Sequence, residues 1–503
     1  MNKLGKDLFF STGFAVLNVL LNFWLIKEAE YLLSALALSV FLVMRRVVPT
    51  FSNLSQLGTS QALIRYASIN KDDKDKIKTY FAISFTIWAC SCIVLAILYF
   101  AFGAELGELI YNEVEGAANF DPYLLLTVWY IAVIHLSYLV QPYFLVQRKV
   151  FFYNVINMMN ASLILLLVIK YIALTTGAGE IENLIIVKIN LSQYLTYALT
   201  FMSIVQLSLM LYIIIQQKIY NYPSIAKIKA YGKEFIQYGL PRSAMTFSDM
   251  FLLTVSAFMI TGSSEDITAF LLALTLARIV LIVLQPISKL SSVVVGNNNS
   301  EERQKTAINL MTGTIIYSTF LLVIILYNWL NVLIQYWISD PERIENVLYA
   351  FSILAFGLIP YSIFHGLKGI IEIKFFRPFN LFSILIAIAL HVILFYALRG
   401  TYGNLYALSF SLMIGFVALG LATLYWCRKD FNNYKYFRLE ILFVVGIALF
   451  ALNFYVNSLY PNIIACILCV LVTAGIYAGI LFFSKVKFIS ETINILLKRG
   501  NNS

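Results

Sequence analysis

The stretch LFFSTGFAVLNVLLNFWLI, residues 8–26, is an almost unbroken apolar run near the start of the chain. About 20 apolar residues are enough to cross the hydrocarbon core of a bilayer. The segment before it, Met1–Asp7, is short and basic, as in a secretion signal. Residues 8–26 nevertheless lack a small-residue cleavage site and already have spanning length. We therefore predict that the first transmembrane helix lies here.

Further runs of this kind follow along all 503 residues. The chain is 60% apolar or aromatic and only 12% charged, with a mean hydropathy of +0.82, whereas a soluble protein is about 25% charged. This composition excludes a cytosolic enzyme, a secreted domain and a disordered protein, because too little polar surface is available to face water. The predicted spans are 8–26, 31–57, 79–102, 122–146, 153–174, 193–216, 238–261, 267–294, 306–334, 346–366, 379–398, 404–427, 440–457 and 462–484.

The sequence thus predicts an all-α polytopic membrane protein with about 14 transmembrane helices. The last two spans are the weakest, because a re-entrant hairpin around Pro461 is an alternative. If the N-terminus is cytoplasmic, 27 of the 36 Lys and Arg residues lie in cytoplasmic segments and 5 on the opposite side. The positive-inside rule therefore predicts that both termini are cytoplasmic. It also explains most of the net charge of +10, so no nucleic-acid partner is expected.

The connecting loops are all short, about 25 residues or fewer, and leave no room for a soluble catalytic or nucleotide-binding domain. The chain contains no phosphate-binding loop of the G-x-x-x-x-G-K-[ST] type. Cys466-x-x-Cys469 has no second cysteine pair and no nearby His. We expect no enzymatic activity, no cofactor and no metal.

A faint internal duplication is visible. Gly5–Phe9 resembles Gly232–Ile236, and Arg148–Asn154 resembles Lys374–Asn380, at nearly the same offset. The matches predict two parallel repeats of six helices, a design common in transporters with a central site between the halves. The predicted domains are residues 1–217, residues 218–430, and a C-terminal segment 431–503 with two extra helices and a cytoplasmic tail.

Few ionisable residues lie inside the predicted spans, where each costs a few kcal/mol and usually faces a protein cavity. Four are cations and one is an acid: Arg45, Arg46, Arg278, Lys289 and Asp249. A cavity with this balance favours an anionic ligand, and the arginine fork fits phosphate oxygens. Two alternatives stay open. Arg46 or Lys289 could extend to the headgroup layer, and Asp249 could be either a structural partner of an arginine or a proton or cation site.

Three stretches at loop junctions carry a family resemblance. Leu57–Tyr66 resembles a Leu-Gly-x-x-x-Ala-x-x-Arg-Tyr segment, Gln237–Pro241 resembles a Tyr-Gly-Leu-Pro entry to a span, and Gln147–Asn160 forms the turn into the fifth span. Together they resemble the polysaccharide transporter and flippase group of the MOP superfamily, to which MATE exporters also belong. The resemblance runs from about residue 5 to 430 and is greatest to Wzx-type O-antigen flippases.

The resemblance implies a flippase of the bacterial inner membrane. Its substrate would be an undecaprenyl-pyrophosphate-linked oligosaccharide, moved from the cytoplasmic to the periplasmic leaflet by alternating access through the cationic cavity. It implies a gate or loop motif comprising Gly58, Arg65, Tyr238, Gly239, Pro241 and Arg242. Membrane lipids, a proton or sodium counter-ion at Asp249, and a polysaccharide polymerase with its chain-length regulator are the implied partners. The family is described with 12 spans, so the last two predicted here are a departure.

Two other functions compete with this interpretation. A MATE-like ion-coupled multidrug exporter binds cations, so its spans should contain an excess of acidic residues. A membrane-embedded polysaccharide polymerase should have a large outer loop with catalytic acids or Arg-rich motifs. The acidic cluster Glu105–Asp121 is the one candidate for such a loop, and a solvated loop explains it better.

Overall fold

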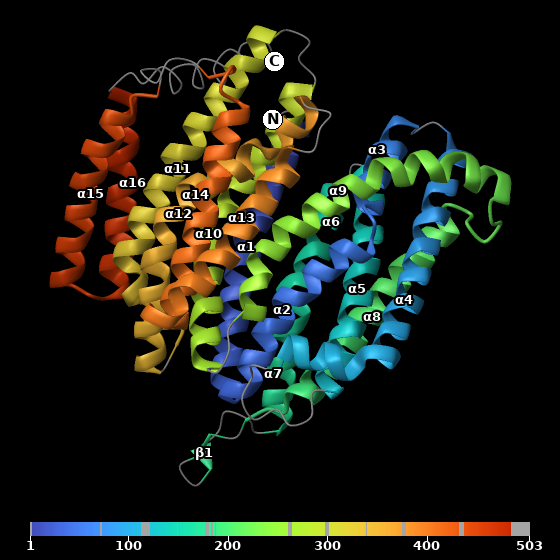
Figure 1. Ribbon diagram of the computed structural model, residues 1–503, viewed down its shortest axis with the longest axis horizontal. Helices are drawn as coiled ribbons and strands as arrows, with labels where there is room; N and C mark the ends of the chain where they lie inside the picture. The colour runs from blue at the N-terminus through green and yellow to red at the C-terminus, as the bar shows by residue number, and fades with distance from the viewer. Residues whose placement is uncertain are drawn as a thin grey trace. The chain divides into compact units, whose positions relative to one another are not determined.

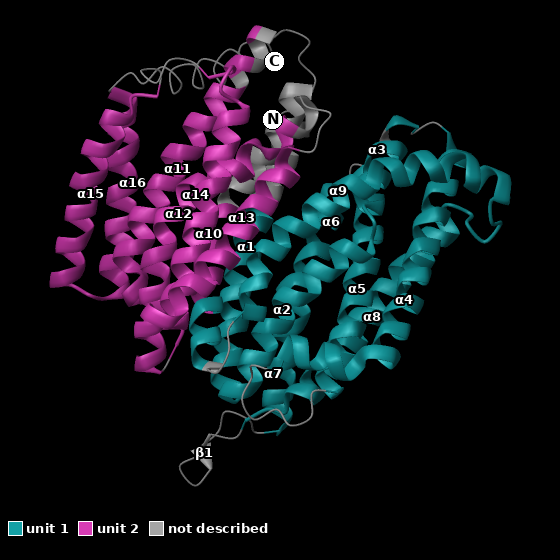
Figure 2. Cartoon of the chain, viewed as in Figure 1, with its two compact units in different colours: residues 1–271 teal, residues 272–503 magenta. Residues whose placement is uncertain are grey.

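A computed structural model gives the fold of the chain. It describes residues 3–483 except for 71–72, 112–120, 148, 177–180, 183–184, 187, 260–263, 297–300, 339, 375–378 and 432–436. The chain forms two compact units, Met1–Leu271 and Leu272–Ser503 (Figure 2).

The first unit is a helical bundle with one very short hairpin (Figure 1). Its elements are α1 (Lys3–Leu32), α2 (Ala35–Ser55), α3 (Thr59–Ile69), α4 (Lys74–Tyr111), α5 (Asp121–Val146), α6 (Val150–Met158), the π-helical turn η1 (Met159–Leu163), α7 (Ile164–Thr176), β1 (Ile181–Glu182), β2 (Ile185–Ile186), α8 (Leu191–Gln216), α9 (Ile225–Met259) and the first turns of α10 (Ser264–Gly296). The two strands pair in antiparallel register, Ile181 opposite Ile186.

The described residues of the second unit form the rest of α10 and six more helices. These are α11 (Glu301–Gln335), α12 (Pro341–Lys374), α13 (Phe379–Tyr402), α14 (Asn404–Trp426), α15 (Leu439–Leu459) and α16 (Ile463–Phe483). α14 packs closely against both α12 and α13, and α11 packs against α12 and α15.

The chain is a multi-pass membrane protein. Among the described residues, eleven helices are long and apolar enough to cross a membrane, with α6, η1 and α7 counted as one. The remaining three predicted spans fall on α1, α9 and α10. The all-helical fold class is confirmed, while the total of 14 crossings stays a prediction. Both helices beside Pro461 are 21 residues long and belong to the eleven.

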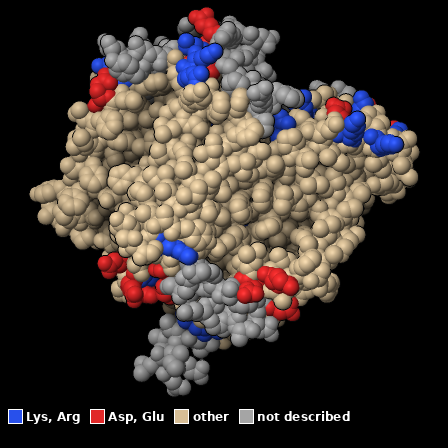
Figure 3. All heavy atoms as spheres, in the orientation of Figure 1, with Lys and Arg blue, Asp and Glu red and all other residues tan. Residues whose placement is uncertain are grey.

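The charges are distributed as a membrane protein requires. On the face drawn in Figure 3, Lys, Arg, Asp and Glu gather towards two ends, and mostly uncharged side chains cover the region between. In the first unit, large apolar side chains such as Ile97, Phe100 and Leu167 are more than half exposed. Such apolar exposure would be unfavourable in water but is expected against lipid tails.

α9 belongs by packing to the first unit. It lies against α2, α3 and α4, and the shared core includes Tyr66, Tyr80 and Phe235. The boundary predicted at 217/218 concerns the sequence repeat and precedes α9, whereas the compact units divide after Leu271. The repeat boundary therefore stays a prediction.

The two C-terminal helices are attached to α11 by a buried polar contact. The indole Nε1 of Trp329 donates to Asn453 Oδ1 over 2.8 Å, and Asn453 Nδ2 donates to Thr473 Oγ1 over 2.9 Å. Both Trp329 and Asn453 are fully buried. Since a buried polar group without a partner is costly, this network fixes where α15 and α16 pack on α11.

Candidate substrate-handling site

Arg45 lies in the middle of α2, one turn before Pro49. Its Nη2 atom donates to Asn22 Oδ1 of α1 over 2.7 Å and to the carbonyl oxygen of Ala161 in η1 over 3.0 Å. The guanidinium carbon lies 5.7 Å from the ring centroid of Phe41. The predicted cavity cation is therefore half-buried inside the first unit, where the α1, α2 and η1 segments meet.

The π-helical turn η1, which supplies the Ala161 carbonyl group to Arg45, also contains a buried polar side chain, Asn160. Asn160 Nδ2 donates to Ser137 Oγ over 2.7 Å, and Gln206 Nε2 donates to Asn160 Oδ1 over 3.0 Å. Gln141 Nε2 also donates to Ser137 Oγ, over 2.9 Å. All four side chains are buried. Because π turns often occur at functional sites, this network marks the centre of the unit as more than helix packing.

Arg46, the next residue, points to a different neighbour. Its Nη2 atom donates to the carbonyl oxygen of Leu271 on α10 over 3.3 Å, and the side chain is 9% exposed. Adjacent residues on a helix are about 100° apart, so the two arginines serve different contacts. Arg46 does not extend to a headgroup layer, because it is buried within the unit.

For the other charged residues predicted for the cavity, the structure gives the position on a helix and, for two of them, the burial of the side chain. Asp249 on α9 is buried, at 3% exposure, in the same unit as Arg45 and Arg46. Arg278 is half-buried on α10 within the second unit. Lys289 also lies on α10, and its side chain is outside the described part of the structure. Convergence of Arg45 and Arg278 on one ligand stays a prediction.

A row of polar contacts joins α2 to α9. Thr50 Oγ1 and Thr254 Oγ1 lie 2.7 Å apart, and Ser243 Oγ donates to the carbonyl oxygen of Asn53 over 2.7 Å. Ser243, Thr50 and Thr254 are each about 1% exposed. The small side chains of Ser and Thr let two helices approach closely in a membrane, and their hydroxyl groups form hydrogen bonds across the interface.

Next to this row of polar contacts, the backbone of the α2–α3 turn comes into direct contact with the backbone of α9. The turn between α2 and α3 places Leu57 and Gly58 at positive φ, 48° and 72°. A Cβ added at Gly58 would overlap the Gly239 carbonyl group, and one added at Gly239 would lie 2.8 Å from the Leu57 carbonyl oxygen. Both glycines of the predicted gate motif are therefore required by a single close approach between the α2–α3 turn and α9.

The remaining members of that motif surround the same point. The guanidinium carbon of Arg242 lies 3.7 Å from the ring centroid of Tyr238, and that of Arg65 lies 4.6 Å from it. Pro241 lies inside α9, exposed to the surroundings. Next to them, burial raises the pKa of Tyr66 to about 12, so its hydroxyl group stays protonated. Gly58, Arg65, Tyr238, Gly239 and Arg242, distant in sequence, thus form one junction.

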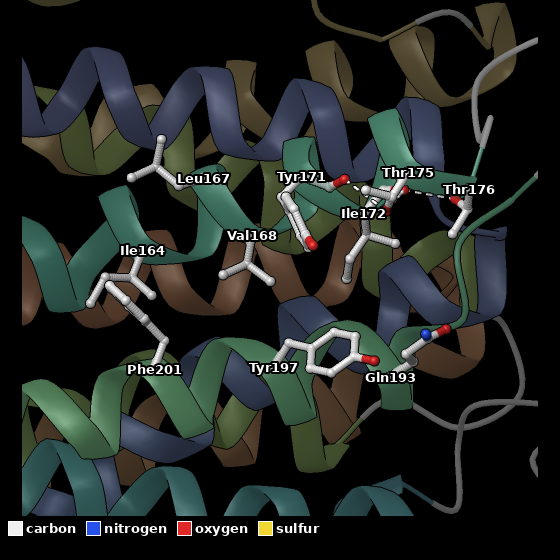
Figure 4. Close-up of a pocket in the computed structure, with 10 residues that line it drawn as sticks. All are labelled: Ile164, Leu167, Val168, Tyr171, Ile172, Thr175, Thr176, Gln193, Tyr197 and Phe201. Atoms are coloured by element: carbon white, nitrogen blue, oxygen red, sulfur yellow. Dashed lines mark hydrogen bonds between the residues drawn. The ribbon is translucent and has the colours of Figure 1, made fainter.

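A separate pocket lies between α7 and α8 (Figure 4). Its volume is about 540 Å³, and its lining residues are Ile164, Leu167, Val168, Tyr171, Ile172, Thr175, Thr176, Gln193, Tyr197 and Phe201. No lining residue is charged, and Figure 4 shows Tyr171 and Tyr197 on opposite walls. An uncharged pocket of this kind suits hydrocarbon rather than an anionic headgroup, so it is distinct from the arginine site.

Sequence reasoning identified the charged residues but missed their polar partners. Asn22, Asn160 and Gln206 were not predicted as site residues, although amide side chains inside apolar spans are themselves unusual. Their spacing inside three of the predicted spans was the available signal. The π turn had no sequence signal that hydropathy could reveal.

Comparison with known proteins places this geometry in a fold. No protein-family model matches the sequence, and no curated protein matches it. Among solved structures, the lipid II flippase MurJ in an inward closed conformation is similar with a TM-score of 0.65 and 15% identity, over 94% of this chain and 99% of that chain. An inward-facing multidrug resistance MATE family transporter of the MOP superfamily gives a TM-score of 0.62 and 14% identity, over 82% and 94%. The chain has the MATE and MurJ fold.

The Vibrio cholerae MATE transporter VcmN in its bent form is similar as well, with a TM-score of 0.56 and 14% identity over 85% of this chain and 97% of that chain. These matches confirm the predicted fold, and the relationship to the MOP superfamily stays a prediction. The match to MurJ leaves only 6% of the chain uncovered, which is fewer residues than segment 431–503 contains. It therefore takes in part of the α15–α16 segment.

Proposed function

We propose that the protein is a flippase for an undecaprenyl-pyrophosphate-linked oligosaccharide, such as an O-antigen repeat unit. It would move this lipid from the cytoplasmic to the periplasmic leaflet of the bacterial inner membrane. The proposal rests chiefly on one observation, the likeness to the lipid II flippase MurJ over 94% of this chain and 99% of that chain. The MATE transporters, which share the fold, match 82% to 86% of this chain.

The charges in the spans support an anionic substrate. Arg45 offers a planar fork of donors, and its Nη2 atom donates to Asn22 and to Ala161. Among the described residues, Asp249 is the one buried carboxylate that lies within a predicted span. A MATE-like exporter of cationic drugs would favour the reverse balance, because a cationic substrate requires acidic groups in the cavity.

The proposed mechanism needs no hydrolysis. The headgroup would cross an internal cavity while the polyprenyl tail stays in the bilayer. The cytoplasm is electrically negative, so outward movement of the anionic headgroup is favoured by about 2.3 kcal/mol per charge per 100 mV. The α2–α3 turn and the Gly239 region of α9 are in contact, and in the proposed mechanism this contact closes that end of the first unit. Alternating access would require this junction to separate when the substrate enters.

The test is transport by the purified protein in liposomes. A fluorescent oligosaccharide linked to a polyprenyl diphosphate is placed in one leaflet, and its appearance in the other is measured by quenching. Arg45→Ala and Arg278→Ala should each nearly abolish transport. Arg45→Lys should weaken it partially, because the charge remains and the bidentate fork is lost.

Arg399→Ala is the matched control, since Arg399 stacks on Tyr396 at 4.6 Å and lies away from the predicted cavity. A parallel set of liposomes with a cationic dye tests the exporter alternative. Normal lipid transport by folded Arg45→Ala and Arg278→Ala variants would refute the cationic-cavity mechanism. Extrusion of the dye without movement of the lipid would refute the flippase proposal itself.

A further inference from the structure

An aromatic cluster supports the junction between α3, α4 and α9. The rings of Tyr80 and Phe235 are stacked with centroids 5.6 Å apart, and Tyr66 lies 5.3 Å from Tyr80. Tyr238 meets Tyr66 edge-on at 5.6 Å. Tyr66, Tyr80 and Phe235 are buried, whereas Tyr238 is only partly so. The Tyr238 ring thus packs on the buried aromatic cluster through Tyr66, and part of the ring stays accessible.

Two guanidinium groups share this ring. Arg242 lies 3.7 Å and Arg65 4.6 Å from the centroid of Tyr238. Stacking uses the flat face of a guanidinium group and leaves the N–H donors in its plane free to bond at the edges. One of these donors, Arg242 Nη1, bonds to the carbonyl oxygen of Tyr238 over 3.2 Å. Arg65 is exposed and Arg242 is partly exposed, so a ligand could reach these side chains.

Glu234 of α9 lies beside Tyr66 at this junction, but among the described residues it forms no ion pair with Arg65 or Arg242. Within the part of the chain that the structure describes, no carboxylate oxygen lies within 4.0 Å of either guanidinium group. The neighbouring acid of α4, Asp75, is already paired with Lys227 Nζ over 2.9 Å. Two like charges within 5 Å of the same ring centroid repel each other, so an anion that contacts both would be favourable.

We propose that Arg65 and Arg242, held on Tyr238, bind the phosphate-bearing headgroup of a lipid at the end of the molecule where α3 meets α9. Each guanidinium group can donate two parallel bonds to a phosphoryl group, so the pair suits a diphosphate. The stacked ring fixes both forks before the ligand arrives, which lowers the ordering cost of binding. The charge bias of the sequence places this end at the cytoplasmic surface, where lipid headgroups are within reach.

The site is separate from Arg45. Arg45 lies 20 positions before Arg65 and contacts α1 and η1, so a lipid at the junction is bound before it enters the bundle. Tyr238 is also the neighbour of Gly239, whose close contact keeps the α2–α3 turn against α9. A headgroup bound at the junction would therefore lie directly beside the contact between the α2–α3 turn and α9, which must separate in the proposed transport cycle. That the lipid is the transported one rests on the proposed function.

The experiment measures lipid binding to the full-length protein in neutral detergent by native mass spectrometry. The probes are undecaprenyl diphosphate without sugar, phosphatidylglycerol and phosphatidylcholine. The double variant Arg65→Gln/Arg242→Gln should weaken binding of undecaprenyl diphosphate by about tenfold or more, given charge-assisted bonds of this kind. The pair Arg65→Lys/Arg242→Lys should fall between, because it keeps the charges and loses the forks.

Arg428→Gln is the matched control, because Arg428 stacks singly on Tyr425 at 4.0 Å and is exposed like Arg65. It should leave binding unchanged. Preference for undecaprenyl diphosphate over phosphatidylglycerol identifies the substrate lipid as the ligand, whereas equal losses for both anionic lipids identify a phospholipid headgroup. Either supports the site. Unchanged binding of both anionic lipids in the double glutamine variant, or wild-type binding no stronger than to phosphatidylcholine, would overturn it.

The outcome is independent of transport. If the wild-type protein moves no lipid-linked sugar but the double variant loses phosphatidylglycerol, the proposed function fails and the headgroup site stands. If transport depends on Arg45 while the double variant binds lipids normally, the flippase proposal stands and the headgroup site is refuted.

Discussion

Replacing Gly239 by alanine tests the contact between α9 and the α2–α3 turn. Two opposing effects act at this residue. Alanine in a helix interior is better than glycine by about 1 kcal/mol, which alone predicts a more stable protein. In this structure, however, the new Cβ would lie 2.8 Å from the Leu57 carbonyl oxygen and 3.0 Å from that of Gly58. Both atoms belong to backbone, so neither can turn aside.

The size of the effect follows from these distances. Ordinary contacts begin at 3.4 Å, so the two segments must separate by about 0.5 Å, enough to lose roughly a quarter of the dispersion energy across the contact. Overpacking of this kind typically costs about 1–3 kcal/mol. Gly232 supplies the control, because it lies on the same helix and an added Cβ would meet only Ile83 Cδ1 at 3.9 Å. Gly232→Ala should therefore gain only the stability that comes from the higher helix propensity of alanine.

The assay is maleimide labelling of a single cysteine at Ser243, which is 1% exposed beside the junction, after the five native cysteines are replaced. If opening limits labelling, a difference of about 1–3 kcal/mol between the two variants corresponds to about 5- to 150-fold in rate. Gly239→Ala should label faster than Gly232→Ala by that factor, with both proteins folded. Equal rates, or slower labelling of Gly239→Ala, would show that the close approach does not hold this end closed.

Three further outcomes are expected. Asp249→Asn should remove the proton or sodium dependence of transport if this buried carboxylate couples an ion, measured as initial rate against pH and sodium; unchanged dependence leaves it a structural role. Asn453→Leu should destabilise the attachment of α15 to α11 by about 1–3 kcal/mol, because the indole of Trp329 loses its acceptor; the Tm should fall, while the exposed Ser458→Ala leaves it unchanged. Cysteines at Lys227 and Glu105 should be labelled by an impermeant reagent from opposite sides of the membrane, and labelling from one side would contradict the predicted orientation.

The helices were predictable because length and hydropathy are properties of a local stretch. Each predicted span overlaps at least one helix among the described residues, including the pair beside Pro461. The short helix α3 was missed inside a presumed loop. Its buried residues Ala62, Leu63, Tyr66 and Ala67 follow helical spacing, so an amphipathic search of the loop would have found it.

The site was only partly predictable, because its contacts join residues that are far apart in sequence. Gly58 and Gly239 each stood out in a motif, but nothing local indicated that one excludes a side chain at the other. Arg65 and Tyr238 are likewise on different helices, α3 and α9, and their stacking depends on how these pack. The charged residues in the spans could be identified from the sequence alone. The contacts of Arg45 with Asn22 and Ala161 could be identified only from the structure.

The π turn at Met159–Leu163 has a consequence for how this helix can change over evolutionary time. A π turn accommodates one residue more than an α-helix of the same length. Because the wide turn absorbs the extra residue, deleting a single residue there would restore regular α-helix and narrow the turn itself, while α6 and α7 keep their relative orientation. Asn160 would then leave Gln206, and the Ala161 carbonyl would leave Arg45. A protein with a one-codon deletion here should therefore still insert into the membrane, because the helix is still long enough to span it. The deletion should nevertheless be absent from homologues that keep the function, because the polar contacts of the turn are lost.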